Sequence, residues 1–234
     1  PEIRKIEISK DIFNVTDDYA TFDLSADFTD DLGGFINTID PSIGESFFPD
    51  STMNFSWRSP SGSQSIHAHL YEGMDQDDFR YKDVIIDVDK NNISFDNVEV
   101  TIPQYSEQGT WTLDYINASD AIGNRLDIHK RYDGNYVTEG VDEDGNYIEQ
   151  LIDLDFKTEF EVISSNPDTT APEFKNLELS QYTFDVTDGY ATFDLSADLT
   201  DDISGFISDS HFTQSNIDLV WSSPSGGQFV SAYM

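Results

Sequence analysis

Aspartates gather at the end of two segments that have nearly the same sequence. Tyr19–Asp31 and Tyr190–Asp202 differ at one position, where Leu199 replaces Phe28. The acidic residues of the two copies are Asp27, Asp30 and Asp31, and Asp198, Asp201 and Asp202. Hard oxygen ligands supplied by loops are what Ca²⁺ requires, about six to eight of them in a flexible geometry. The spacing therefore predicts a calcium site after each copy.

The overall charge limits the partners of the chain. It has 46 acidic against 12 basic residues, a formal net charge of −34. Such a field repels nucleic acid and anionic membrane surfaces, so neither is expected as a direct partner. No apolar run approaches the length of a membrane span, and direct membrane insertion is not expected. The acids need salt to screen them or divalent cations to bridge them.

The chain contains no cysteine. It therefore gains no stability from disulfides, which suits a large bacterial surface protein whose folding is supported by metal. Because the sequence begins at Pro1 inside a repeat, we expect it to be a piece of a longer chain.

An internal repeat organises the elements that carry these aspartates. Pro1–Phe35 matches Pro172–Phe206 without a gap, and Phe55–Leu70 matches Leu219–Met234. The sequence thus predicts a complete repeat at 1–165, a linker at 166–171 and the first part of a second repeat at 172–234. Prolines near both ends of the linker restrict its backbone and favour a short, fairly stiff connection.

Apolar and polar residues alternate along most of the repeat. The runs are Ala20–Phe28, Met53–Trp57, Ile66–Leu70, Val98–Ile102, Trp111–Tyr115 and Phe160–Val162. One buried and one solvated face per strand is typical of antiparallel sheets, and about seven such strands indicate a sandwich. No segment has a sustained helical period, so we expect almost no helix. Asp133–Tyr136 and Asp144–Tyr147 predict turns in a hairpin-rich insertion before the last strand.

A series of short motifs resembles the bacterial immunoglobulin-like repeats of giant extracellular proteins. The motifs are Asp168–Pro172, Asp185–Gly189, Leu199–Gly205 and Ser223–Gly227, with Pro103–Glu107, Gly109–Thr112 and Asp120–Asn124 in the first copy. The resemblance departs at Arg125–Lys157, where this chain is longer. It implies immunoglobulin-like antiparallel β-sandwich repeats and an extracellular or cell-surface location, because such repeats occur in adhesins and as accessory modules of secreted enzymes. It implies a fold more firmly than an activity.

The resemblance also suggests further ligands. In an immunoglobulin-like sandwich, the loop after strand B and the loop between strands F and G lie at the same end. If Tyr19–Phe28 is strand B and Gly109–Asn117 is strand F, Asp120 and Asn124 converge on the first acidic cluster.

In the second copy, the linker residue Asp168 is expected to join Asp198, Asp201 and Asp202. A cation there would stiffen the hinge between consecutive units, as in cadherin-like arrays. Because the second copy stops before its F–G loop, we expect its site to be incomplete and weaker than the first.

Other interpretations of these residues remain open. Aspartates commonly solvate loop ends and cap turns, and the acids could be a generic adaptation to salt without a specific ion. Asp87–Asn91 opens like an EF-hand loop but lacks the later glycine and glutamate, so a turn is favoured. His67 and His69 share a strand face and could form half of a transition-metal site.

Catalysis is not expected. The sequence contains no Gly-x-Ser-x-Gly, HExxH, P-loop or GxGxxG motif, and a copied pattern favours a spacer over a singular active site. The sequence thus predicts a non-catalytic structural repeat of a secreted or cell-surface adhesin, rigidified by calcium, whose partners are adjacent repeats of the same polypeptide. The alternative is a glycan-binding or accessory module of a secreted hydrolase, with a glycan or cell-surface ligand.

Overall fold

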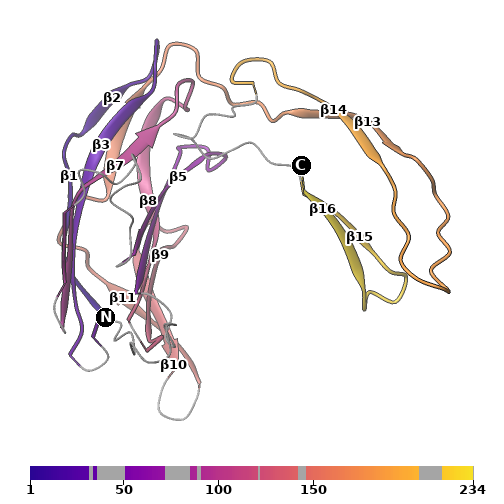
Figure 1. The fold of residues 1–234 in the computed structure, drawn as a ribbon. Coiled ribbons are helices and arrows are strands. Elements are labelled where there is room, and N and C mark those ends of the chain that lie inside the picture. The colour runs from indigo at the N-terminus through magenta and orange to yellow at the C-terminus, as the bar shows by residue number, and fades with distance from the viewer. Residues whose placement is uncertain are drawn as a thin grey trace. The chain divides into compact units, whose positions relative to one another are not determined.

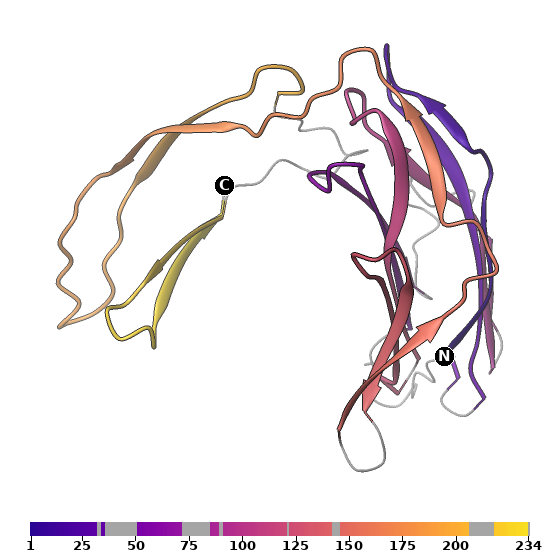
Figure 2. The ribbon, with the colours of Figure 1, turned by 180° about the vertical axis from the view of Figure 1, so that it is seen from behind.

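The computed structural model describes residues 1–31, 34–35, 51–71, 85–88, 91–120, 122–141, 146–205 and 218–233. Within these residues the chain is all-β and has no helix, which confirms the predicted fold class at that level. The chain divides into two compact units, Pro1–Pro167 and Asp168–Met234 (Figures 1 and 2). The division lies inside the predicted linker and places Asp168 with the second unit.

The first unit contains a four-stranded sheet with the strand order β1-β3-β7-β6. Its strands are β1 (Glu2–Ile8), β3 (Ala20–Thr29), β7 (Asn92–Ile102) and β6 (Ile85–Val88). All pairs in this sheet are antiparallel, and β3 is paired on both sides, with β1 and β7. The strand that carries the first acidic cluster at its end is therefore firmly held.

The second sheet of this unit has eight strands, ordered β11-β10-β9-β8-β12-β2, with β4 pairing β8 and β5 pairing β4. Its strands are β2 (Ile12–Asn14), β4 (Thr52–Arg58), β5 (Ser65–Tyr71), β8 (Gly109–Ser119), β9 (Arg125–Lys130), β10 (Tyr136–Val141), β11 (Tyr147–Ile152) and β12 (Glu159–Ile163). Only β12 and β2 pair in parallel among the described strands. The predicted hairpin-rich insertion is confirmed as β9, β10 and β11, whose pairs are antiparallel.

The two sheets enclose one apolar core in a sandwich-like arrangement. Phe22 of β3 lies edge-on to Trp57 of β4 at 5.6 Å between ring centroids, and it contacts Phe160 of β12 at 5.5 Å. All three side chains are at most 2 % exposed. Burial of each such ring contributes about 1.5–3 kcal/mol, so this aromatic cluster is a main source of the stability of the unit.

The predicted alternation is confirmed along β3, β4, β5 and β12, with one correction in β8. Trp111 and Leu113 are buried as expected, but Tyr115 does not continue on their face. The register between β4 and β8 shifts, so that Leu113 lies opposite Trp57 and Tyr115 opposite Ser56. After such a β-bulge the side chains that would have pointed outward point inward, so Ile116 is buried in place of Tyr115.

The second unit contains two separate two-stranded sheets. They pair β13 (Glu173–Leu179) with β14 (Leu195–Thr200), and β15 (Asp218–Ser222) with β16 (Phe229–Tyr233). Because the second copy repeats the alternating run Ala20–Phe28, a strand is expected from Ala191 on, but the strand begins only at Leu195. In the first unit the equivalent residues, from Ala20 on, pair with β7. Among the described residues of the second unit, β14 pairs with β13 alone.

Candidate metal centre

The turn after β14 positions a carboxylate through its own backbone. Asp201 Oδ1 accepts hydrogen bonds from the backbone N–H groups of Gly205 at 2.7 Å and Ile203 at 3.2 Å. The Ser204 hydroxyl donates to the same oxygen at 3.2 Å. Gly205 has a φ of 64°, a left-handed conformation that favours glycine. The motif Asp-Asp-Ile-Ser-Gly thus folds into a closed turn that fixes Asp201.

Asp168 joins this turn from the segment that precedes β13. Its side chain is 5 % exposed. Oδ1 accepts the Thr170 N–H at 3.0 Å and the Thr170 hydroxyl at 3.1 Å, and Oδ2 accepts the Ser204 N–H at 3.1 Å. The entry segment and the turn after β14 are therefore tied together through one buried carboxylate.

The carboxylates of Asp168, Asp201 and Asp202, the carboxylate trio, form a compact group. One oxygen from each lies within 4.8 Å of the other two. The Thr170 hydroxyl lies 2.5 Å from Asp202 Oδ1 as well, and its single hydrogen can serve either Asp168 or Asp202. Two oxygens that share one Ca²⁺ can be up to about 5 Å apart, since each Ca–O bond is about 2.3–2.6 Å. The spacing of the trio fits a single calcium ion.

Hydrogen bonds keep the buried member of the trio ionised. Burial raises the pKa of Asp168, but hydrogen bonds from Ser204 and Thr170 outweigh this effect and lower the pKa below its ordinary value. The ionised form therefore stabilises the second unit above the unfolded-state pKa of about 3.9. That contribution is lost as the pH falls through the folded-state pKa.

The electrostatics of the trio favour a cation. Neither Asp201 nor Asp202 forms an ion pair with a lysine, arginine or histidine in the part of the chain that the structure describes. Three acidic groups in a small volume repel one another, and a divalent cation removes that repulsion. The arrangement is therefore suited to binding a hard cation.

Asp198, the fourth ligand predicted for this unit, lies outside the trio. It is on β14 opposite Lys175 and accepts a hydrogen bond from the Asn176 side chain at 2.7 Å. It is the fourth residue of β14, and the partners described for it belong to β13.

The first unit has a matching contact between an aspartate and a glycine. Asp30 Oδ1 accepts the Gly34 N–H at 3.0 Å, and Gly34 has a φ of 70°. Asp30 Oδ2 lies 2.8 Å from the backbone nitrogen of Pro1, and both residues are nearly buried. Asp31 is exposed, while Asp27 is half-buried on β3 between Lys5 and Ser94.

Asp120 and Asn124 close the turn between β8 and β9 on themselves. The fully buried Asp120 carboxylate accepts the N–H groups of Ile122 at 3.0 Å and Asn124 at 2.8 Å, and the Asn124 side-chain amide at 2.7 Å. Among the described residues, the trio is the one group of three His, Cys, Asp or Glu with metal-ligand spacing. The structure therefore does not gather Asp27, Asp30, Asp31 and Asp120 into a comparable group.

The sequence analysis missed two residues of the site, Thr170 and Ser204. Their spacing in the sequence could have indicated both, because Asp-x-Thr and Asp-x-x-Ser place a hydroxyl within reach of a preceding carboxylate. The other metal candidates add nothing to the site. Part of Asp87–Asn91 lies outside the described residues, between the paired strands β6 and β7. His69 Nδ1 lies 2.6 Å from Asn54 Oδ1, and His67 Nε2 lies 2.9 Å from Ser65 Oγ.

Comparisons of the chain with protein-family models, curated proteins and solved structures gave no match. Within the described segments, no helix has the length and apolar character needed to cross a membrane. Arguments about function therefore rest on the fold and on the carboxylate trio.

Proposed function

We propose that this chain is a non-catalytic structural segment of a secreted or cell-surface adhesin. Its units are immunoglobulin-like β-sandwich repeats, and Ca²⁺ bound by the carboxylate trio makes the second unit rigid. The single observation that supports the calcium proposal most directly is the spacing of Asp168, Asp201 and Asp202, with one oxygen of each within 4.8 Å of the others.

The connectivity of the trio explains why an ion there would matter mechanically. Asp168 lies in the segment that leads into β13, whereas Asp201 and Asp202 follow β14. β13 and β14 pair so that Glu173 lies opposite Thr200. An ion held by all three carboxylates fixes the entry segment against the turn and restricts the backbone through which a preceding repeat is connected. The repeat then acts as a spacer that resists bending.

The expected energy is large enough to control the stability of the unit. Extracellular modules bind Ca²⁺ with a Kd on the order of 10⁻⁴–10⁻³ M. Free calcium at about 100 times Kd adds about 2.7 kcal/mol to the free energy of unfolding, a substantial fraction of ordinary domain stability. This stabilisation by bound calcium adds to the general screening by salt that a chain with a net charge of −34 receives.

Thermal unfolding in three buffers tests the proposal. The chain is melted in EGTA, in millimolar calcium, and in EGTA with NaCl matched to the ionic strength of the calcium buffer. We expect calcium to raise the Tm of the second unit beyond the effect of NaCl. Identical melts in EGTA and calcium contradict the proposal, and an equal effect of NaCl indicates salt adaptation without a specific ion.

A second candidate function, glycan binding, is favoured by one observation in the first unit. A polar groove of about 440 Å³ lies on the outer face of the eight-stranded sheet, and Tyr115 offers an aromatic ring there. Its polar lining is Asn54, Asn117, Arg125, Asp127, His129 and Glu139. Side chains of this kind can hydrogen-bond sugar hydroxyls while an aromatic ring packs against the sugar face. Retention on a polysaccharide that Tyr115→Ala abolishes would support this function.

A further inference from the structure

Two histidines lie side by side on the outer face of the eight-stranded sheet. His67 and His69 are two residues apart on β5, so their side chains share one face of the strand, and both are exposed. Their ring centroids lie 6.2 Å apart at an interplanar angle of 14°. Two imidazoles bound to one ion through metal–nitrogen bonds of about 2.0–2.1 Å have centroids about 5–6.5 Å apart. The pair therefore has the spacing of two ligands of one metal ion.

A row of hydrogen bonds crosses the sheet from His69. His69 Nδ1 lies 2.6 Å from Asn54 Oδ1 on β4. Asn54 Nδ2 donates to Asn117 Oδ1 on β8 at 3.4 Å, and Asn117 Nδ2 donates in turn to Asp127 Oδ1 on β9. The strand register holds the row together, because each of these side chains lies directly opposite the next one.

The carboxylate at the end of this row sets the direction of every bond in it. An ionised carboxylate only accepts hydrogen bonds, so Asp127 selects the NH₂ group of Asn117. The oxygen of Asn117 then faces Asn54 and selects its NH₂ group, which leaves the Asn54 oxygen for His69. An amide oxygen also only accepts, so Nδ1 of His69 carries the hydrogen. In a neutral imidazole, Nε2 of His69 then has the lone pair that can bind a metal.

This arrangement matches that of metal-binding histidines. A ligating imidazole usually donates its second N–H to a carboxylate, a carbonyl or water, which fixes the tautomer and the orientation of the ring. The Asn54 oxygen serves this purpose for His69. At His67, Nε2 lies 2.9 Å from the Ser65 hydroxyl oxygen. Since a hydroxyl can accept a hydrogen from Nε2, Nδ1 of His67 can hold the lone pair.

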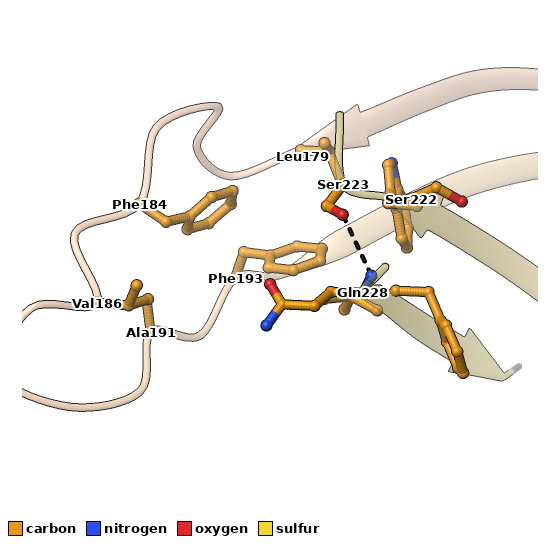
Figure 3. A pocket seen from close by; sticks show the side chains of 11 residues that line it. Leu179, Phe184, Val186, Ala191, Phe193, Ser222, Ser223 and Gln228 are labelled. Carbon is orange, nitrogen blue, oxygen red and sulfur yellow. Dashed lines mark hydrogen bonds between the residues drawn. The ribbon is translucent and has the colours of Figure 1, made fainter. Parts of the chain in front are cut away.

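The second unit builds the same hairpin without the imidazoles. In the first unit, a glutamine N–H donates to a serine hydroxyl oxygen at 3.2 Å in the turn between β4 and β5. In the turn between β15 and β16, the Gln228 N–H donates to the Ser223 hydroxyl oxygen at the same distance of 3.2 Å (Figure 3). The residues of β16 at the two histidine positions are Ser231 and Tyr233. The hairpin therefore does not need the histidines in order to fold.

We propose that His67 and His69 together bind a divalent transition-metal ion, with water in its remaining coordination positions. Imidazole nitrogens suit Zn²⁺, Cu²⁺ and Ni²⁺, whereas Ca²⁺ takes oxygen ligands. The histidine site is thus chemically distinct from the carboxylate trio and does not depend on it. The net charge of −34 favours the site further, because it concentrates cations near the surface of the chain. Asn54 is a positioning residue, since it acts on the metal through His69.

Nuclear magnetic resonance of the imidazole rings tests the site with zinc chloride as the probe. The whole chain is kept in millimolar calcium, so that calcium competes with zinc for carboxylates. We expect zinc to shift the ring signals of His67 and His69 together, with one dissociation constant. His67→Gln and His69→Gln should each lower the zinc affinity by about tenfold or more, because one imidazole is left. Both side chains are exposed, so neither substitution should disturb the fold.

A third histidine provides the matched control. His129 lies on the same sheet face but on β9, where its Nε2 is 3.6 Å from Glu139 Oε1. His129→Gln should leave the zinc affinity at His67 and His69 unchanged. Ring signals of these two residues that do not move in millimolar zinc overturn the proposal. An equal loss of affinity in His129→Gln overturns it as well.

Two substitutions of Asn54 test its positioning role. Asn54→Leu removes the acceptor of the His69 Nδ1–H and should lower the zinc affinity by about tenfold, a usual effect of losing a partner of a metal ligand. Asn54→Asp keeps an acceptor oxygen and should retain the affinity. Without zinc, the nitrogen shifts of the His69 ring should show the Nδ1–H tautomer in the unmodified chain and a mixture of tautomers in Asn54→Leu. Equal losses in both variants, or an Nε2–H tautomer in the unmodified chain, overturn this role.

Discussion

Asp30 and Asp201 occupy matching positions in the two repeats but have different neighbours. Each aspartate accepts a hydrogen bond from the N–H of a glycine with a left-handed φ, Gly34 or Gly205. In the second unit two further carboxylates lie beside Asp201, whereas Asp30 belongs to no such group among the described residues. The matching sequences thus form the same hydrogen bond from glycine to aspartate, while the carboxylates around that aspartate differ.

The ranking of the two sites follows from this difference. The first site was expected to be the more complete one, because it has a full F–G loop. Among the described residues, metal-ligand spacing is found instead in the second unit, where the Ser204 N–H links Asp168 to the turn. Asp120 of the first unit is engaged within its own turn.

The largest expected contrast between the units concerns their cores. Phe22→Ala removes a fully buried ring and should lower the free energy of unfolding of the first unit by about 3–5 kcal/mol. Phe193→Ala should cost the second unit only about 1 kcal/mol, since its ring is half-exposed at an open pocket. Hydrogen exchange at the amides of β3 and β14, as a function of denaturant, measures the two values separately. Equal losses would mean that the pocket is closed in solution.

Neutralising a turn aspartate should have a different effect in each unit. Asp120→Asn replaces the fully buried oxygen that accepts the Asn124 side-chain amide and should cost about 1.5–3 kcal/mol in EGTA. Asp201→Asn should change stability by less than about 0.5 kcal/mol in EGTA. The three hydrogen bonds described for Asp201 all reach Oδ1, which asparagine retains. Chemical denaturation provides the comparison, and a large cost for Asp201→Asn would show that its charge matters without an ion.

The smallest contrast is expected at the glycines. Gly34→Ala and Gly205→Ala each force a side chain into a left-handed conformation, at a cost of about 1–2 kcal/mol. Because both glycines have a left-handed φ and donate to the matching aspartate, the two costs should agree. Urea unfolding measured by exchange in each unit checks this, and a twofold or larger disagreement would indicate that the turns differ in solution.

Most of the fold was predictable from period-two alternation. The buried positions of β3, β4, β5 and β12 follow directly from this alternation, because these strands pair with neighbours on both sides or in a regular register. Two features were not predictable in this way. The bulge opposite Trp57 depends on the register of β4 against β8, and the late start of β14 at Leu195 depends on which strands pair with it. Both are tertiary effects that local sequence does not contain.

The sequence indicated which residues could be metal ligands, but not which of them lie together in the structure. Nine ligand residues were expected, and the structure brings Asp168, Asp201 and Asp202 together. Spacing along the chain does not show that Asp120 is satisfied by its own hairpin, nor that the N–H of Ser204 links Asp168 to the turn. Competition between local hydrogen bonds and distant ligands decides which carboxylates can bind an ion.

A calcium titration of two matched variants tests the calcium site most directly. Asp202→Asn removes one charge of the trio, and Asp31→Asn makes the same change at the equivalent position of the first unit. Isothermal titration calorimetry should give one site in the unmodified chain, an affinity reduced by about tenfold or more in Asp202→Asn, and an unchanged affinity in Asp31→Asn. Calcium binding that is equally affected by both variants, or is absent from the unmodified chain, would contradict the assignment of the trio as the metal centre.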